Sequence, residues 1–169
     1  TLDLPLLREW VAAVRESTDL VVQLSTGGSV HDPLEERLKV LDAEPDSCSL
    51  TMGTTNFGDD VFLNAPADMQ RFLDAMRAHG VVPEFEIFDA GHLATLLRWV
   101  KKGLVAAPAH VDFVLGVPGA MPGTPEALMY LRAQLPAGFS WAVAGIGAAQ
   151  LPLAMMAIAL GGHVRVGFE

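Results

Sequence analysis

Residues 83–102, Pro-Glu-Phe-Glu-Ile-Phe-Asp-Ala-Gly-His-Leu-Ala-Thr-Leu-Leu-Arg-Trp-Val-Lys-Lys, contain a predicted strand and a predicted helix in direct succession. Acidic and apolar residues alternate along Pro83–Phe88, and this period of two predicts a β-strand with Glu84 and Glu86 on one face. Gly91–Lys102 instead carries apolar residues at the spacing of a helix. A strand followed at once by a helix is the repeating part of a parallel βαβ unit.

The same alternation of strand and helix runs through the whole chain. The strand candidates are Leu20–Ser25, Ser47–Met52, Pro83–Phe88, Val111–Gly116, Ser140–Gly145 and His163–Phe168, and the helix candidates are Leu4–Ser17, Pro33–Leu41, Pro66–His79, Gly91–Lys102, Pro125–Gln134 and Gln150–Leu160. Asp3, Asp32 and Thr124 stand where helix N-caps are expected. Strands joined by helices predict an α/β protein with a parallel sheet and right-handed crossovers.

A parallel sheet can stay open and doubly wound, or it can close into a barrel. No G-x-G-x-x-G or Walker motif follows a strand, which disfavours dinucleotide and nucleotide binding. Polar, glycine-rich segments follow most strands, at 25–28, 53–58, 116–119 and 145–147. Such residues at most strand ends, rather than at one switch point, favour a (β/α)₈ (TIM) barrel.

A TIM barrel has eight strands, whereas this chain offers six candidates. We therefore expect residues 1–169 to form a single domain that is an incomplete barrel. An open barrel would expose strand edges, so either the chain is a piece of a longer protein or another polypeptide completes the barrel.

Composition and charge restrict the functional classes. The chain has 11 basic and 20 acidic residues, a net charge of −9, which disfavours nucleic-acid binding. The uncharged stretch 133–164 is interrupted by prolines and glycines, so we expect no membrane span there. The single cysteine, Cys48, makes no internal disulfide, and no signal peptide is recognisable. A cytoplasmic protein is expected.

The last strand candidate carries charged residues on one face. His163, Arg165 and Glu169 share this face, while Val164, Val166 and Phe168 share the other. The apolar set must pack against helices, so the polar set should point into the barrel. Buried charges are costly unless they are paired or bind a ligand. Arg165 and Glu169 therefore predict either an ion pair that closes the barrel or a functional site.

Two further strands present polar side chains near their ends. Glu86 lies one layer above Glu84 and is the better candidate for a site residue. Ser25 and Thr51 could donate hydrogen bonds to a substrate carboxylate or carbonyl, or could serve only as helix caps or backbone partners. His92, just after a strand, is a weaker candidate. The chain has no H-x-H or H-x-x-x-H pair, so it cannot build an ordinary zinc site alone.

Five runs of residues resemble one enzyme family. They are Met-Gly-Thr-Thr-Asn-Phe-Gly-Asp-Asp (52–60), Pro-Glu-Phe-Glu-Ile-Phe-Asp (83–89), Phe-Val-Leu-Gly-Val-Pro-Gly-Ala-Met-Pro-Gly-Thr (113–124), Ala-Gly-Ile-Gly (144–147) with Gln-Leu-Pro (150–152), and Gly-Gly-His-Val-Arg-Val-Gly-Phe-Glu (161–169). In this order and spacing they resemble the β-keto acid cleavage enzyme family. The resemblance implies a (β/α)₈ barrel of which this chain corresponds to strands 3 to 8, without the first two strands and the last helix.

The resemblance also implies roles for particular residues. The family holds Zn²⁺ with an H-x-H pair on the second strand and a glutamate at the end of the eighth, which corresponds to Glu169. Arg165 corresponds to the arginine of a catalytic arginine–aspartate pair, and Glu86, with Glu84 as the alternative, to a fifth-strand glutamate. Ser25 and Thr51, together with Gly27 and Asn56, are the expected substrate-binding residues.

The implied activity is a zinc-dependent acyl transfer in which a β-keto acid and acetyl-CoA give acetoacetate and a new acyl-CoA. The family further implies a homotetramer, and the chain by itself is expected to be inactive. Ala148 and Ala149 stand where a basic residue is expected in many members, which leaves the acyl-CoA contacts open. The alternatives are another metal-dependent C–C lyase or aldolase on the same barrel, or a truncated, non-catalytic barrel module.

Overall fold

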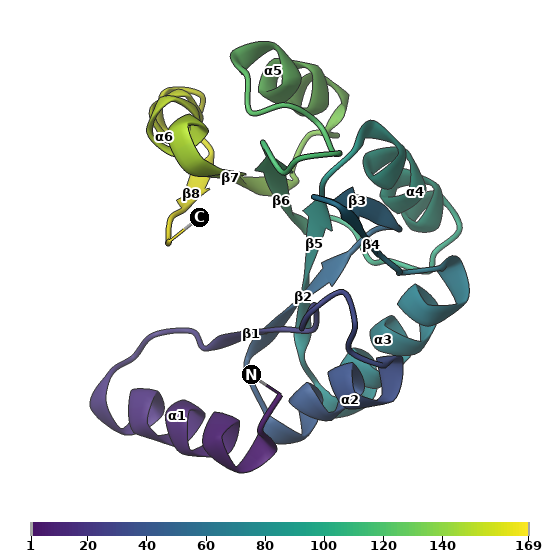
Figure 1. Ribbon diagram of the computed structural model, residues 1–169, viewed down its shortest axis with the longest axis vertical. Helices are drawn as coiled ribbons and strands as arrows, with labels where there is room; N and C mark the ends of the chain where they lie inside the picture. The colour runs from purple at the N-terminus through teal and green to yellow at the C-terminus, as the bar shows by residue number, and fades with distance from the viewer. Residues whose placement is uncertain (1, 169) are drawn as a thin grey trace.

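A computed structural model of the chain describes residues 2–168. Its main sheet has six parallel strands in the order β1-β2-β5-β6-β7-β8. These are β1 (Gln23–Ser25), β2 (Ser47–Thr51), β5 (Val82–Ile87), β6 (His110–Leu115), β7 (Ser140–Gly145) and β8 (His163–Arg165). The sheet curves into an open arc with β1 and β8 at its two ends (Figure 1). This arrangement confirms the predicted part of a barrel and excludes a flat doubly wound sheet.

The helices lie along the convex side of the arc (Figure 1). They are α1 (Leu4–Ser17), α2 (Leu34–Leu38) with the 3-10 helix η1 (Lys39–Ala43), α3 (Pro66–His79), α4 (Ala90–Lys101), α5 (Pro125–Gln134), and the 3-10 helix η2 (Gly147–Ala149) leading into α6 (Gln150–Ala159). The Asp3 carboxylate accepts from the Leu6 N–H at 3.1 Å and the Thr124 hydroxyl from the Ala127 N–H at 3.3 Å, as predicted for N-caps. No helix within residues 2–168 is long and apolar enough to cross a bilayer.

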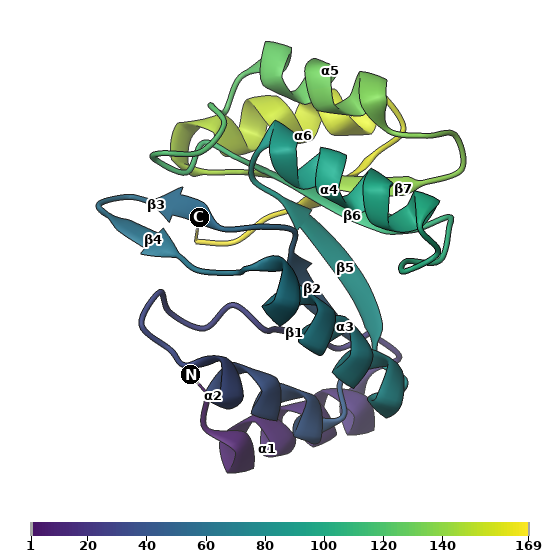
Figure 2. The same cartoon turned by 90° about the vertical axis from the view of Figure 1, so that its right-hand side faces the viewer.

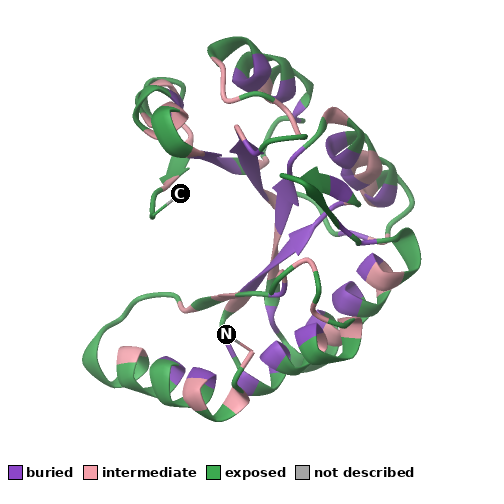
Figure 3. Ribbon diagram, in the orientation of Figure 1, coloured by how far each residue is buried: buried purple, intermediate pink, exposed green. Residues whose placement is uncertain are grey.

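The hydrophobic core lies between the sheet and the helices, where Figure 3 shows the buried faces of both. Val111, Phe113 and Leu115 of β6 are completely buried there. Trp141 of β7 packs against Phe113, with ring centroids 5.9 Å apart, so this indole faces the helices. Burying side chains of this size stabilises the fold by roughly 1.5–3 kcal/mol each. The alternate residues of every strand are thereby directed to the concave face.

One element was not predicted. The segment expected to be a glycine-rich loop after β2 contains an antiparallel hairpin, β3 (Thr55–Phe57) and β4 (Asp60–Phe62), shown beside the main sheet in Figure 2. Gly58 begins its turn with φ 66°, a conformation that glycine adopts without steric cost. The Gly58 N–H donates to the Pro118 carbonyl at 3.0 Å and ties the hairpin to the loop after β6.

Three predicted elements are shorter by at least three residues in the structure. The strand predicted at Leu20–Ser25 is limited to Gln23–Ser25, because the Val22 N–H donates to Asp46 Oδ2 at 2.8 Å instead of to a neighbouring strand. The strand predicted at His163–Phe168 ends at Arg165, and the Gly167 N–H donates to Gln150 Oε1 at 3.0 Å.

The helix predicted at Pro33–Leu41 is α-helical only over Leu34–Leu38 and then tightens into η1. Asp32 does not cap this helix. Its carboxylate accepts from the Ser29 N–H at 2.6 Å, within the preceding loop.

Candidate active site

A cavity of about 400 Å³ lies at the carboxyl ends of the parallel strands, the end at which barrel enzymes carry their active sites. Its polar lining includes Ser25, Gly27, Thr51, Glu86 and Arg165. Its apolar lining consists of Val30, Phe57, Phe62, Phe88, Val114, Val117 and Ile146. Five of the seven predicted site residues therefore come together in one pocket.

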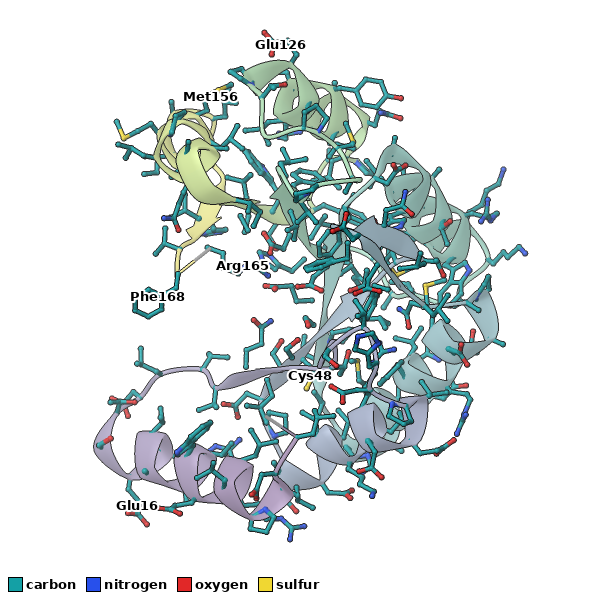
Figure 4. All side chains as sticks on the ribbon, viewed as in Figure 1. Glu16, Cys48, Glu126, Met156, Arg165 and Phe168 are labelled. Atoms are coloured by element: carbon teal, nitrogen blue, oxygen red, sulfur yellow. The ribbon has the colours of Figure 1, made fainter. Side chains whose placement is uncertain are left out.

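Arg165 enters this pocket from β8, on the concave side of the arc (Figure 4). Its Nη1 lies 2.9 Å from Glu86 Oε1 and 2.8 Å from Asp112 Oδ2. The side chain is 32% exposed, so the guanidinium is held by two carboxylates and still reaches the cavity. The sequence placed Arg165 correctly on the inner face, but its partners among residues 2–168 are on β5 and β6.

Glu86 has both carboxylate oxygens fixed. Oε1 accepts from Arg165, and Oε2 accepts from the Thr51 hydroxyl at 2.9 Å. Thr51 and Glu86 are both buried and stand opposite each other in the β2–β5 register. In this arrangement the hydroxyl of Thr51 positions Glu86, and Glu86 in turn positions Arg165.

Glu84 lies below the pocket on the same face of β5. Its Oε2 is 3.3 Å from His110 Nε2, and His110 Nδ1 is 2.8 Å from the Ser140 hydroxyl. Burial acts to raise the pKa of Glu84, but the hydrogen bond and charge of His110, with smaller contributions from Gln23 and Arg165, outweigh it and lower the pKa. Of the two candidate glutamates, the pocket is lined by Glu86.

Asp112 is a buried member of the site that the sequence interpretation missed. It stands opposite Glu86 in the β5–β6 register and is completely buried. Burial raises its pKa to about 7, against the opposing charge of Arg165. The alternation that placed Glu84 and Glu86 inward also applies to β6, where Val111 and Phe113 face the helices, so the signal was present.

Ser25 and Gly27 form the wall of the pocket that follows β1. Ser25 Oγ accepts from the Gly27 N–H at 3.0 Å and from the Ser49 hydroxyl at 3.3 Å. These two bonds occupy both acceptor positions of the Ser25 hydroxyl. The hydroxyl hydrogen can still be donated to a ligand.

Asn56 stands apart from this group. Asn56 lies on the hairpin, where its Nδ2 donates to the Gly119 carbonyl at 3.5 Å, whereas its neighbours Thr55 and Phe57 line the pocket. The structure therefore does not bring Asn56 together with the other predicted residues. Glu169, the predicted metal ligand, lies outside the described residues.

A buried arginine supports the loops around the pocket. Arg37 of α2 donates to the Thr26 carbonyl at 2.8 Å and to Asn64 Oδ1 at 3.3 Å, and it stacks on the ring of Phe62, 4.6 Å from its centroid. Asn64 also donates to the Thr51 carbonyl at 2.5 Å. Burial lowers the pKa of Arg37 against the charges of nearby aspartates. These contacts join the β1, β2 and hairpin segments, and no local sequence pattern indicated them.

His92, the weaker candidate, supports the base of the hairpin from α4. It is buried, its Nε2 lies 3.2 Å from the Thr54 carbonyl, and its Nδ1 accepts from the Phe88 N–H at 3.4 Å. Burial lowers its pKa. His92 is not among the residues that line the pocket.

The described residues do not by themselves fit a zinc site. Within residues 2–168, no three His, Cys, Asp or Glu side chains are grouped so that they could hold a metal ion. The polar groups in the pocket are instead arranged around Arg165, the only basic side chain among the described residues that line it.

Comparisons with known proteins agree with this architecture. The model of the beta-keto acid cleavage enzyme family matches residues 1–169. A 3-keto-5-aminohexanoate cleavage enzyme from Fusobacterium nucleatum subsp. nucleatum is 40% identical over 171 residues, covering 100% of this chain and 62% of the relative. One of the same name from Acetoanaerobium sticklandii is 42% identical over 161 residues, covering 94% of this chain and 59% of the relative.

A 3,5-dioxohexanoate:acetyl-CoA acetone transferase from Paraburkholderia graminis is 33% identical, covering 100% of this chain and 64% of the relative. The apo structure of ObcA superposes with a TM-score of 0.79 at 20% identity, covering 100% of this chain and 45% of that one, which supports the fold. The chain thus spans about three fifths of the length of the first curated relatives. By its match along the whole sequence and its barrel-type sheet, this chain belongs to the beta-keto acid cleavage enzyme family.

Proposed function

We propose that the chain supplies much of the active site of an acyltransferase that converts a β-keto acid and acetyl-CoA into acetoacetate and a new acyl-CoA. The observation that carries this proposal is the convergence of Ser25, Thr51, Glu86 and Arg165 from four strands in one pocket. The names of the relatives, which are cleavage enzymes and an acetyl-CoA-dependent transferase, support the type of reaction.

The proposed reaction exchanges one carbon–carbon bond for another. The bond between the keto carbonyl and the adjacent CH₂ of the β-keto acid breaks, and the same CH₂ forms a bond to the carbonyl of acetyl-CoA. The C–S bond of acetyl-CoA breaks as its acetyl group is transferred, and the acyl group that remains from the β-keto acid forms a new thioester with the sulfur of CoA. Negative charge develops during this exchange, so fixed donors and a fixed cation in the pocket would stabilise its transition state.

The residues of the pocket suit these tasks. Arg165 presents a guanidinium whose position is set by Glu86, and a planar guanidinium binds carboxylates in a defined orientation. We assign to Arg165 the role of orienting a carboxylate. This is either the aspartate of the arginine–aspartate pair, which would act as the base, or the carboxylate of the substrate. Ser25 would donate its remaining hydrogen to that carboxylate. The apolar wall at Val117 and Ile146 would accommodate the uncharged part of the acyl group.

We also propose Zn²⁺ as the cofactor, on the basis of the family resemblance. Glu169 would be one ligand, and the others would come from parts of the protein that this chain does not contain. A bound zinc ion would supply Lewis acidity toward the keto carbonyl.

Acetyl-CoA dependence tests the proposed function. The full-length protein is incubated with a series of β-keto acids, with and without acetyl-CoA, and the acyl-CoA products are identified by mass spectrometry. We expect consumption of the β-keto acid only when acetyl-CoA is present. Cleavage without acetyl-CoA would instead identify a lyase or aldolase, and no reaction with any β-keto acid would favour a non-catalytic module.

A further inference from the structure

Asp112 lies directly behind the pocket. Its side chain is completely buried, does not line the cavity, and places Oδ2 2.8 Å from Arg165 Nη1. Neither of its carboxylate oxygens accepts a hydrogen bond from any residue within 2–168, so the contact with Arg165 is an ion pair. Asp112 thus contacts the cation of the pocket from the side that a ligand cannot reach.

Negative charge exceeds positive charge around this cation. Arg165 Nη1 contacts Glu86 and Asp112, and Glu84 lies on the same face of β5. Among the described residues, the other titratable groups on this face are His110 of β6 and His163 of β8, whose ring centroids lie 6.1 Å apart, and β7 has no charged residue. Glu169 is predicted on the same face but lies outside the described residues. When both of its contacting carboxylates are ionised, Arg165 belongs to a group with a net negative charge.

We propose that Asp112 is a positioning residue for Arg165 and that binding of a carboxylate ligand in the pocket is coupled to uptake of a proton by Asp112. An ionised Asp112 neutralises Arg165 from behind and repels an incoming anion. Protonation of Asp112 removes one of the negative charges that contact the guanidinium. Because such coupling is reciprocal, a bound anion favours the protonated form of Asp112. The proposal deepens the proposed function and relies on it only for the choice of ligand.

The ionisation of Asp112 falls in the range where this coupling matters. Burial raises its pKa most, Glu84 and Glu86 raise it further, and Arg165 and His110 oppose them, giving a pKa of about 7. The protonated, anion-binding form therefore dominates below pH 7 and is lost as the pH rises above it.

The experiment measures acetoacetate binding to the full-length protein by calorimetry at pH 6 and pH 8, without acetyl-CoA. Acetoacetate is fully ionised at both pH values, so a change in affinity must come from a change in the ionisation of the protein. For one linked proton with a pKa of about 7, we expect about tenfold weaker binding at pH 8. Repeating the titration in buffers of different ionisation enthalpy should show uptake of about half a proton at pH 7.

The Asp112→Asn variant distinguishes proton uptake by Asp112 from proton uptake by the histidines. It should bind acetoacetate with nearly the same affinity at both pH values. The matched control is Asp74→Asn, which changes an exposed aspartate that is also paired with an arginine, Arg77 at 3.0 Å, and should keep the tenfold difference. Equal wild-type affinity at both pH values, no binding at pH 6, or a tenfold difference that survives in Asp112→Asn would each overturn the proposal.

Two further outcomes are informative. If Asp112→Asn does not fold, proton uptake in a His110→Gln/His163→Gln double variant decides, because uptake that persists without both histidines supports Asp112 and uptake that disappears contradicts it. A protein with the predicted pH-dependent binding but without acyl transfer from acetyl-CoA would refute the proposed function and leave this inference standing.

Discussion

Among the described residues that line the pocket, Arg165 is the only basic one, and its surroundings explain why arginine is needed. Its guanidinium donates from Nη1 to Glu86 and contacts Asp112 through the same nitrogen. A lysine ammonium is a point charge that cannot reproduce this planar arrangement. The role of Arg165 therefore depends on geometry as well as on charge.

Arg165→Lys should lower turnover of the full-length enzyme on the order of 100-fold, the loss expected for a displacement of about 1 Å at a reacting centre. Zinc content should stay near normal, since arginine is not a ligand. Arg98→Lys, an exposed arginine of α4, is the control and should retain activity. Normal turnover with a lower melting temperature would show that Arg165 forms only a structural ion pair.

Glu84 should contribute to stability in acid. A carboxyl group whose pKa is lowered by folding stabilises the protein above its unfolded pKa, and this stability is lost as the pH falls through the lower folded pKa. Because the pKa of Glu84 is lowered from 4.5, Glu84→Gln should lose less stability than wild type on acidification below that value. Denaturant unfolding at a series of pH values measures this, with exposed Glu9→Gln as control, and parallel curves for Glu84→Gln and wild type would contradict it.

The residues of the site were predictable as far as side-chain alternation determines them. That rule placed Glu84, Glu86 and Arg165 on the concave face, and it would have placed Asp112 there as well. It could not show that Arg165 pairs with Glu86 and Asp112, because those contacts depend on the register between strands. Nor could it show that Asn56 lies outside the pocket, because this follows from the hairpin.

At the level of elements, the hairpin β3–β4 contributes Phe57 and Phe62 to the pocket and was missed by sequence analysis. Each strand has only three residues, too few for a clear alternation. The two residues between them, Gly58 and Asp59, are nevertheless a recognised turn signal. The strands of the main sheet, of which β1 and β8 also have only three residues, were predicted because they alternate with helices whose apolar periods extend over more residues.

The hairpin depends on Asn64, which is completely buried and bonded to the Thr51 carbonyl and to Arg37. Asn64→Ala leaves these groups without their partner and should lower the free energy of unfolding by about 1–3 kcal/mol. Asn56→Ala, on the same hairpin but exposed, should change it by no more than about 0.5 kcal/mol. Equal effects of the two substitutions in denaturant unfolding would contradict this assignment.

At the level of the whole molecule, the six strands form an arc with β1 at one end and β8 at the other. Val166 and Phe168 are exposed beyond β8.

Because no group of three metal ligands exists within residues 2–168, the 169-residue chain alone should bind zinc weakly. The full-length protein should contain about one zinc per chain and lose most of it in Glu169→Gln. Metal analysis of all three proteins tests this, and tight stoichiometric zinc binding by the 169-residue chain would contradict the ligand assignment.

The central claim is that the pocket around Arg165 belongs to an enzyme that exchanges an acyl group between a β-keto acid and acetyl-CoA. Isotope tracing tests it most directly, with acetyl-CoA labelled with ¹³C in both acetyl carbons and an unlabelled β-keto acid. We predict that both labelled carbons appear together in acetoacetate, as its methyl and carbonyl carbons, while the new acyl-CoA stays unlabelled. Cleavage of the β-keto acid that leaves acetoacetate unlabelled, or forms none, would contradict the account.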